Sequence, residues 1–243
     1  MIQLPVQQIQ LPSLKEACVQ QLETLILSGE LRMGERLPPE RDLAAQLNIS
    51  RPILHDALVD LETKGLLEII PRRGTYVSDY RRNGSLAILS SLLNYHDGSL
   101  NQELMGSMLE MRLLIESETG RLAAVNRTEE QLKEFQIILD DEKSTPCNEV
   151  QTLTNLDFAF HHLIAIASGN QIYPLILNSF RTVYTSITGD FFSKYYDTSV
   201  IRTVHQFHQN IIEAIQRQDV EGTHQLMIKM LNHGETYLKG DVS

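Results

Sequence analysis

The chain has 243 residues, of which 42% are hydrophobic and 21% charged, and its formal net charge at pH 7 is −10. This length and composition are typical of one large or two ordinary globular domains, and they exclude a disulfide-stapled miniprotein and a disordered or collagen-like chain. Taken for the whole chain, the acidic charge argues against a surface coated with cations for nucleic acid.

The two cysteines, Cys18 and Cys147, lie far apart in the sequence. They indicate neither a disulfide framework nor a cysteine zinc cluster, and they fit a reducing cytoplasm in which we expect both thiols to be buried. Residues 1–12 form an N-terminal extension without the basic start and apolar run of a secretory signal. No segment approaches the roughly 18 uninterrupted apolar residues of a membrane span. We therefore expect a cytoplasmic protein with no membrane partner.

Three helices are predicted at the start of the chain. Residues 13–28 place apolar side chains at helical spacing, and a second helical run, RDLAAQLN, follows two prolines. A third run begins with Ser50 as its N-cap and Pro52 in its first turn, where a missing N–H costs nothing, and it ends at Gly65. Only a short turn separates the second helix from the third.

After Gly65 the apolar pattern changes from helical to strand-like. The segments LLEII and TYVS flank the turn-forming sequence Pro-Arg-Arg-Gly at 71–74, which predicts a short hairpin with a basic tip. Two helices joined by a tight turn and followed by a hairpin describe a winged helix-turn-helix, whose second helix enters the DNA major groove. We assign this domain to residues 13–78.

The remainder of the chain is predicted to be helical. Residues 79–85 are polar and indicate a linker, and residues 86–243 contain only helical periodicities. The predicted helices span residues 86–95, 100–125, 128–143, 150–168, 170–192, 197–217 and 219–239. The fold class is therefore mainly α, with the winged domain followed by an all-α antiparallel bundle of six or seven helices.

The charge is distributed unevenly between these two parts. Up to Arg82 there are ten basic and eleven acidic side chains, whereas the remainder carries eleven basic and twenty acidic ones. Within the first part, Arg41, Arg51, Arg72 and Arg73 fall at helix starts and at the hairpin tip, where a duplex would lie. Alternatively, these arginines are ordinary surface residues in contact with solvent. The acidic bundle is not expected to touch DNA.

The segment LPPERDLAAQLNISRPILHDALVDLETKGLLEIIPRRGTYV resembles the DNA-binding domain of the GntR family of bacterial transcription regulators, whose Pro-x-Glu-Arg-Asp-Leu-Ala signature stands at 38–44. The helical part resembles the FCD-type effector domain of the FadR subfamily. That likeness rests on EMR at 110–112, DFAFH at 157–161, SGN at 168–170 and the segments around His208 and His233. The resemblance implies that residues 86–243 bind an effector and dimerise.

The resemblance also implies roles for single residues in the winged domain. Arg41 and Arg51 would contact bases or phosphates, Ser50 a phosphate, and Arg72, Arg73 and Gly74 would form the wing tip. His55 departs from the family, which usually has arginine at this position. Arginine makes a bidentate pair with guanine and histidine does not. We therefore expect DNA binding through these residues, with His55 changing the operator sequence that is read.

A metal site is predicted in the helical part. Asp157 and His161 are four residues apart and share one inward helix face, while His208 and His233 each lie on an apolar stripe of a later helix. From periodicity alone, hydrogen-bonded core histidines are the commoner explanation. The resemblance favours a metal, because many members of the subfamily have one aspartate and three histidines at these positions. Such a set suits Zn, or alternatively Ni or Mn, with open positions.

The other histidines have weaker claims to a metal. His205 and His224 are the substitutes if the assumed helix register is off. His162 and His96 are interpreted as surface or packing residues.

Arg112 is a candidate effector-binding residue, because its planar guanidinium can hold a carboxylate with two parallel hydrogen bonds. The alternative is an internal ion pair with Glu116, four residues later on the same helix. The segments SGNQIYPLILNSFRTVYTSI and SLAILSSLLNY resemble the acyl-CoA-responsive branch of the subfamily. A small carboxylate bound at a metal is the favoured effector, and an acyl-CoA that would regulate lipid metabolism is the alternative.

These predictions describe a homodimeric regulator, by the family's commoner outcome a repressor, whose affinity for a palindromic operator depends on the effector. Two other classes compete with it. A metalloenzyme could use the metal to activate water, but no general base is suitably spaced and the winged domain would have no purpose. An architectural DNA-binding protein without a ligand would have no interior polar cluster in its bundle.

Overall fold

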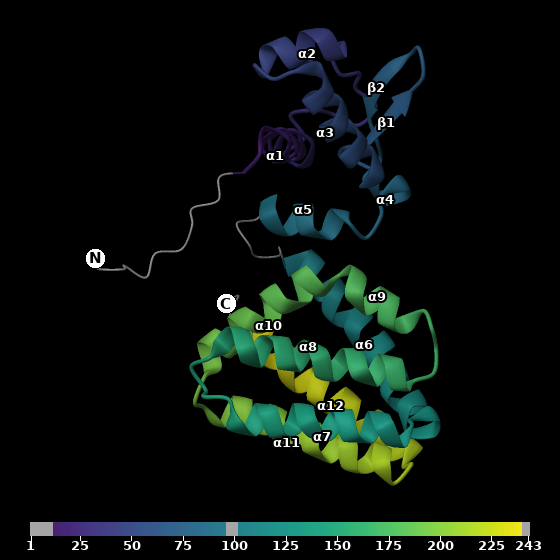
Figure 1. Ribbon diagram of the computed structural model, residues 1–243, viewed down its shortest axis with the longest axis vertical. Coiled ribbons are helices and arrows are strands. Elements are labelled where there is room, and N and C mark those ends of the chain that lie inside the picture. Colours follow the sequence, from purple (N-terminus) through teal and green to yellow (C-terminus); the bar gives the residue numbers. More distant parts are fainter. Residues whose placement is uncertain (1–11, 96–101, 240–243) are drawn as a thin grey trace, which may run out of the picture. The chain divides into compact units, whose positions relative to one another are not determined.

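The computed structural model describes residues 12–95 and 102–239, which belong to two compact units that divide after Tyr95 (Figure 1). Over these residues the chain forms twelve helices and one two-stranded antiparallel hairpin. The predicted mainly-α fold class, a winged helix-turn-helix followed by a helical bundle, is confirmed. Among the described helices, none is both long enough and apolar enough to cross a membrane.

The first unit contains three helices, the hairpin and two further helices. Its elements are α1 Leu14–Leu27, α2 Glu40–Gln46, α3 Arg51–Thr63, β1 Leu67–Ile70, β2 Gly74–Val77, α4 Tyr80–Asn83 and α5 Ile88–Tyr95. The core lies between α1, α3 and the hairpin and is built from fully buried leucines such as Leu22, Leu54 and Leu61. This apolar core holds α2 and α3 in the helix-turn-helix arrangement.

Local signals determine where these elements begin and end. Ser13 caps α1 in a reciprocal capping box with Glu16, because each side chain bonds the backbone N–H of the other, at 3.2 and 2.7 Å. After α3 the chain turns at Gly65, whose φ of 78° is unfavourable for other residues. A side chain at Gly65 would also collide with the backbone carbonyl of Asn83. The helix therefore ends where the sequence predicts it.

The hairpin is the wing. Its register pairs Leu67 with Val77 and Ile70 with Gly74, and Arg36 adds an isolated antiparallel bridge to Tyr76. The turn residues 71–73 between the strands are exposed. The hairpin thus packs its strands against the core while its basic tip remains in solvent.

The first unit is longer than the predicted winged domain. The predicted linker contains the short helix α4, and α5, which was predicted to open the bundle, packs against α1. Ser91 of α5 donates to the buried carboxylate of Glu23 at 2.7 Å, and Lys64 at the end of α3 bonds both, at 2.5 Å to Glu23 and 3.1 Å to Ser91. This network ties α5 to the winged unit.

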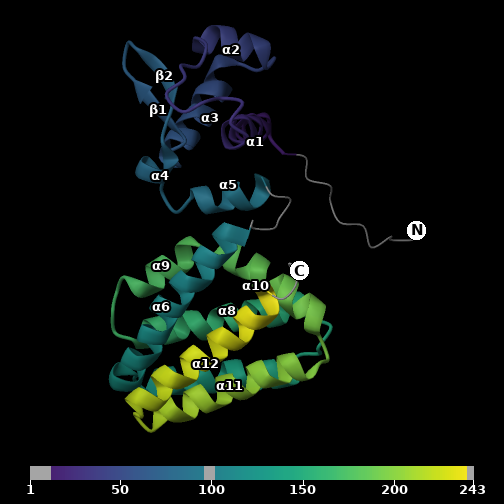
Figure 2. The same ribbon diagram turned by 180° about the vertical axis from the view of Figure 1, so that it is seen from behind.

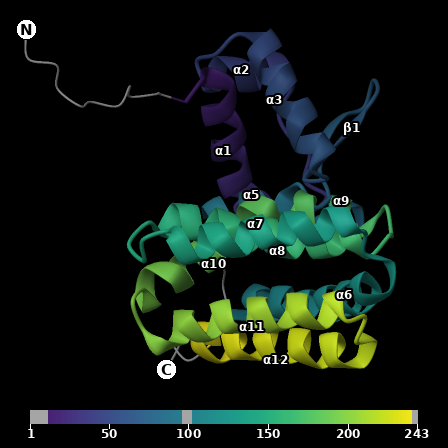
Figure 3. The same cartoon turned by 60° about the horizontal axis from the view of Figure 1, so that its bottom comes forward.

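The second unit has seven helices over its described residues. They are α6 Gln102–Asn126, α7 Glu129–Ser144, α8 Val150–Ala167, α9 Tyr173–Ser179, α10 Arg181–Tyr195, α11 Ser199–Gln216 and α12 Val220–Lys239. The long helix α6 packs against α8 and α12, and α11 runs beside α12 (Figures 2 and 3). The cores include Phe135, Phe160 and Ile211, all fully buried.

Two predictions for the second unit need correction. Residues 170–192, predicted as one helix, form α9 and α10, because Pro174 belongs in a first turn and the backbone leaves helical geometry at Phe180. Cys147 is exposed in the turn between α7 and α8, so only Cys18 is a buried thiol. Neither change moves the helices that carry the predicted metal ligands.

Candidate functional site

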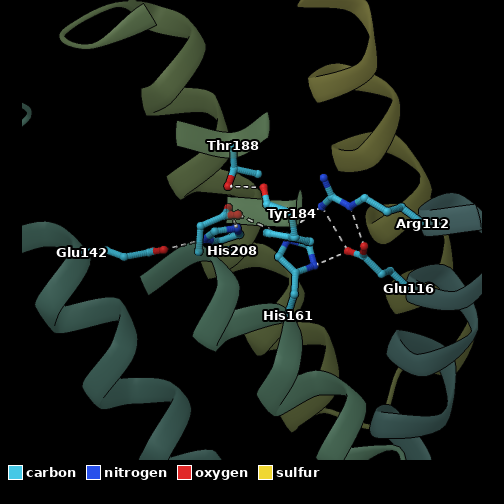
Figure 4. Close-up of polar contacts among 8 residues, drawn as sticks. Arg112, Glu116, Glu142, His161, Tyr184, Thr188 and His208 are labelled. Carbon is cyan, nitrogen blue, oxygen red and sulfur yellow. Dashed lines mark hydrogen bonds and ion pairs between the residues drawn. The ribbon is translucent and has the colours of Figure 1, made fainter. Parts of the chain in front are cut away.

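A cluster of buried polar side chains lies in the core of the second unit (Figure 4). Asp157 and His161 come from the inward face of α8, and His208 comes from α11. One ligand atom from each of the three lies within 4.8 Å of the others, and all three residues are buried. Nε2 of His208 has no hydrogen-bond partner and lies 3.7 Å from Oδ1 of Asp157. The structure thus brings three of the four predicted metal ligands together.

Each member of this cluster has a polar partner behind it. Glu142 of α7 lies 2.8 Å from Nδ1 of His208, Glu116 of α6 lies 2.6 Å from Nδ1 of His161, and the Tyr184 hydroxyl donates to Asp157 at 2.9 Å. A carboxylate behind a metal-binding histidine fixes the ring orientation and leaves the other nitrogen for the ion. The donor set and its supports therefore fit a divalent transition metal.

The fourth predicted ligand, His233, is not brought to this cluster. Its Nε2 lies 3.3 Å from the backbone carbonyl oxygen of Val200, and its ring packs against Phe207 and Tyr237. On α12 the residues that face the neighbouring cavity are Met230, Leu231, Gly234, Glu235 and Leu238. His233 is one residue from Gly234 and so lies about 100° away around the helix. The helix does have an inward-facing stripe, as predicted, but His233 does not lie on it.

The remaining histidines can also be placed. His205 is half-buried near Glu142, and burial lowers its pKa. His162 stacks on Phe158, which agrees with the packing role predicted for it. His224 lies near Glu118 on α6. His96 lies outside the described residues.

Arg112 forms the predicted alternative, a buried ion pair with Glu116. Its Nε donates to Glu116 at 2.6 Å, and Nη2 donates to Glu116 at 3.3 Å and to Tyr184 at 2.9 Å (Figure 4). Burial alone would raise the pKa of Glu116, but the positive charge and hydrogen bonds of Arg112 lower it to about 2. Similarly, burial would lower the pKa of His208, but the carboxylate of Glu142 raises it.

Arg112 also borders a cavity in the second unit. The cavity is about 50 Å³ in volume, and its walls include Asp157, His161, Phe191 and Phe192. One side therefore offers charged and metal-binding groups and the other side apolar rings. A lining that combines a few polar groups with apolar rings is typical of small-molecule sites.

Sequence reasoning missed Glu142 and Tyr184. Glu142 follows Phe135 and Leu139 at helical spacing, so a carboxylate on a buried stripe was a signal that could have found it. Tyr184 similarly lies on the apolar stripe of α10 with Phe180 and Ile187.

The predicted DNA-contacting residues lie in the first unit. Arg41, Ser50, Arg51 and His55 are exposed on or next to α2 and α3, and Arg72, Arg73 and Gly74 form the wing tip. The Ser50 hydroxyl makes no cap bond with α3. His55 lies 3.2 Å from Glu40, and a groove connects the wing tip with the start of α2.

Comparisons with known proteins match both units. The profile of the gntR family of bacterial regulatory proteins matches residues 14–77, and that of the FCD domain matches residues 107–233. The regulator Mce2R of Mycobacterium tuberculosis is 35% identical over 175 residues, which cover 71% of this chain and 70% of that protein. The repressor NanR of Escherichia coli is 28% identical over 227 residues, 90% and 82% of the two chains.

Solved structures agree in fold. Escherichia coli McbR/YncC is 17% identical and aligns with a TM-score of 0.53 over 96% of this chain and all (100%) of that chain. A Listeria monocytogenes protein, Lar, described as controlling expression of the agr system, is 14% identical with a TM-score of 0.64, over 96% and 99% of the chains.

The exposed winged helix-turn-helix and the helical unit with an interior site define a DNA-binding transcription regulator with an effector-binding domain, and not an enzyme. The chain belongs to the GntR family, with an FCD domain as its second unit.

Proposed function

We propose that this regulator is a repressor that binds a palindromic operator as a homodimer, and that a small carboxylate bound at a metal ion controls its operator affinity. Two observations support the proposed metal and effector site in the second unit. His208 carries a buried nitrogen without a partner that faces Asp157, and Asp157, His161 and Arg112 border one cavity. The direction of regulation is supported by NanR, a relative that is named a repressor.

Asp157, His161 and His208 would hold the metal, with zinc as the first choice and nickel or manganese as alternatives. When bound, the ion would bridge α8 and α11 and offer open positions to a carboxylate. Glu116 and Glu142 hold the two imidazoles in orientation through Nδ1. None of these roles is catalytic.

Arg112 would orient the effector. Its contacts with Glu116 and Tyr184 use three of the five N–H donors of a guanidinium, and the two on Nη1 remain for an anion in the cavity. A cavity of about 50 Å³ is well below the roughly 150 Å³ that accepts benzene. This size favours a small acid over a long acyl chain, and so a carboxylate over acyl-CoA.

DNA contact would come from Arg41, Ser50, Arg51 and His55 at the helix-turn-helix and from Arg72, Arg73 and Gly74 at the wing. The exposure of the arginines, Ser50 and His55 supports this assignment, since positive groups at the start of a recognition helix and at a wing tip meet phosphates and groove edges. A protein with this partner works where the chromosome lies, and we therefore propose a cytoplasmic location.

Elemental analysis tests the metal. We expect about one ion per chain in the wild type and in His233→Ala, and loss of the ion in His208→Ala, because only His208 belongs to the cluster. Retention of metal by His208→Ala would overturn the proposed site. Loss in His233→Ala would restore the fourth ligand that the sequence predicts.

Thermal-shift screening tests the effector. Metal-loaded and chelated protein are compared with small carboxylates and with acyl-CoAs, because a ligand that binds the native state raises the melting midpoint. We expect a shift with a small carboxylate that requires the metal. If acyl-CoA raises the melting midpoint equally in metal-loaded and chelated protein, the proposed effector class is wrong.

Fluorescence anisotropy with DNA from upstream of the gene tests the regulator as a whole. We expect saturable binding that weakens with salt and changes when the identified effector is added, since effector and DNA affinities are coupled reciprocally. Binding to no genomic fragment would contradict the proposed operator.

A further inference from the structure

The outward face of α6 carries apolar side chains that nothing in the described second unit covers. Leu114 is 73% exposed and Val125 is 49% exposed, with Met111 half-buried on the same face. The opposite face of this helix packs into the core through residues such as Met108 and Leu109. On the outward face the apolar residues stand together with the charged residues Glu118 and Arg121. The outward face of α6 therefore has the composition of a contact surface.

An ion pair lies between the exposed apolar residues. Arg121 donates to Glu118 twice, from Nε at 2.8 Å and from Nη2 at 2.7 Å. Both side chains are more than a third exposed. Each of these charges therefore has open space on its solvent side, where a further partner of opposite sign can approach.

The order of these residues is self-complementary. Leu114 stands as far before the bond between Thr119 and Gly120 as Val125 stands after it, and Glu118 and Arg121 are likewise equidistant from it. If a second α6 is turned antiparallel about a two-fold axis at this point, Leu114 of each copy meets Val125 of the other. Each carboxylate then meets a guanidinium of the other copy. This is the requirement for an interface in which both subunits use the same patch.

We propose that the outward face of α6, defined by Met111, Leu114, Glu118, Arg121 and Val125, binds a second copy of this chain, with the two α6 helices antiparallel. The inference rests on the proposed homodimer and names the surface that forms it. The central charges would join into a network of four, which fixes the helix register as well as the partner.

Neighbouring residues enlarge the patch. One helix face of this length falls short of the roughly 800 Å² per partner that a stable interface buries. Asn126 at the end of α6 donates to the carbonyl oxygen of Ser168 at 2.7 Å, which places the turn before α9 beside this face. Ile172, 58% exposed, and Leu175, 62% exposed, follow that turn. If they lie on the same side as the outward face of α6, they would supply further apolar area for the second copy.

Sedimentation equilibrium of the full chain tests the surface. Leu114→Glu would put two charges into the apolar part of the interface, and we expect the dimer dissociation constant to rise at least about tenfold. Ile137→Glu is the matched control, because Ile137 is also 60% exposed but lies on α7. We expect the control to assemble as the wild type does, and both variants to keep wild-type helical circular dichroism.

A charge-exchange experiment separates contacts between chains from contacts within one. Glu118→Arg and Arg121→Glu each place like charges together and should each weaken self-association. Mixed in equal amounts, they should form a heterodimer that recovers most of the wild-type affinity, because every charge then meets its opposite across the interface. The ion pair inside each chain stays broken in that mixture, so a purely local effect would not be rescued.

Three results would overturn the inference. If Leu114→Glu leaves the dimer dissociation constant unchanged, or if the mixture of charge variants does not regain affinity, another surface is used. The proposed homodimer would then stand. A wild-type chain that remains monomeric at micromolar concentration would contradict the interface and the proposed homodimer together.

Discussion

The two units place their functional groups in opposite environments. In the first unit the arginines of the helix-turn-helix and wing are exposed over an apolar core, whereas in the second unit Arg112, Asp157 and His208 are buried. DNA is large and must be met at the surface, while a small ligand is held best where water is excluded. The free-energy cost of the charged groups is therefore higher in the second unit, because buried charges need partners and exposed charges do not.

The largest expected effect comes from removing a buried charge. Arg112→Met removes the guanidinium that pairs with the buried Glu116 carboxylate, and we expect the free energy of unfolding to fall by about 3–5 kcal/mol. Urea denaturation with circular dichroism measures the loss. Arg217→Met, which breaks an exposed pair with Glu213, should change stability by less than about 1 kcal/mol. If both variants lose the same free energy of unfolding, the buried ion pair is no more important for stability than the exposed one.

Glu142, whose carboxylate faces Nδ1 of His208, should affect metal affinity more than folding stability. Glu142→Gln removes the carboxylate that faces Nδ1 of His208, and we expect metal affinity to fall about 10- to 100-fold. Isothermal titration with zinc measures it. Asp140→Asn on the exposed side of the same helix is the control and should bind as the wild type does. Unchanged affinity in Glu142→Gln would show that this carboxylate does not serve the ion.

At the wing the expected change is in binding and not in stability. Arg73 is exposed and its backbone φ is not positive, unlike that of Arg72, so Arg73→Ala should keep the free energy of unfolding within about 0.5 kcal/mol. The slope of log affinity against log salt should fall by about 1, because one phosphate contact is lost. Arg202→Ala, in the second unit and also exposed, should leave this slope unchanged. A salt slope equal to the wild-type value would remove Arg73 from the DNA contacts.

The sequence by itself determined the elements and which side chains point inward. Caps, glycines and the change from helical to strand period are local, so α1, α3 and the wing were predicted close to their observed bounds. The same periodicity showed that Asp157, His161 and His208 face the core. These inferences succeed because a residue's side of a helix depends only on its spacing from near neighbours.

Only the tertiary structure decided which inward groups meet. Glu142 and His208 are 66 positions apart and Asp157 and Tyr184 are 27 apart, and no local spacing pairs them. His233 also points away from solvent in part, yet the packing of α12 turns it from the cluster toward Val200. Periodicity establishes the side of each helix, but the helix rotations and neighbours that bring ligands within reach of one ion depend on how the whole core packs.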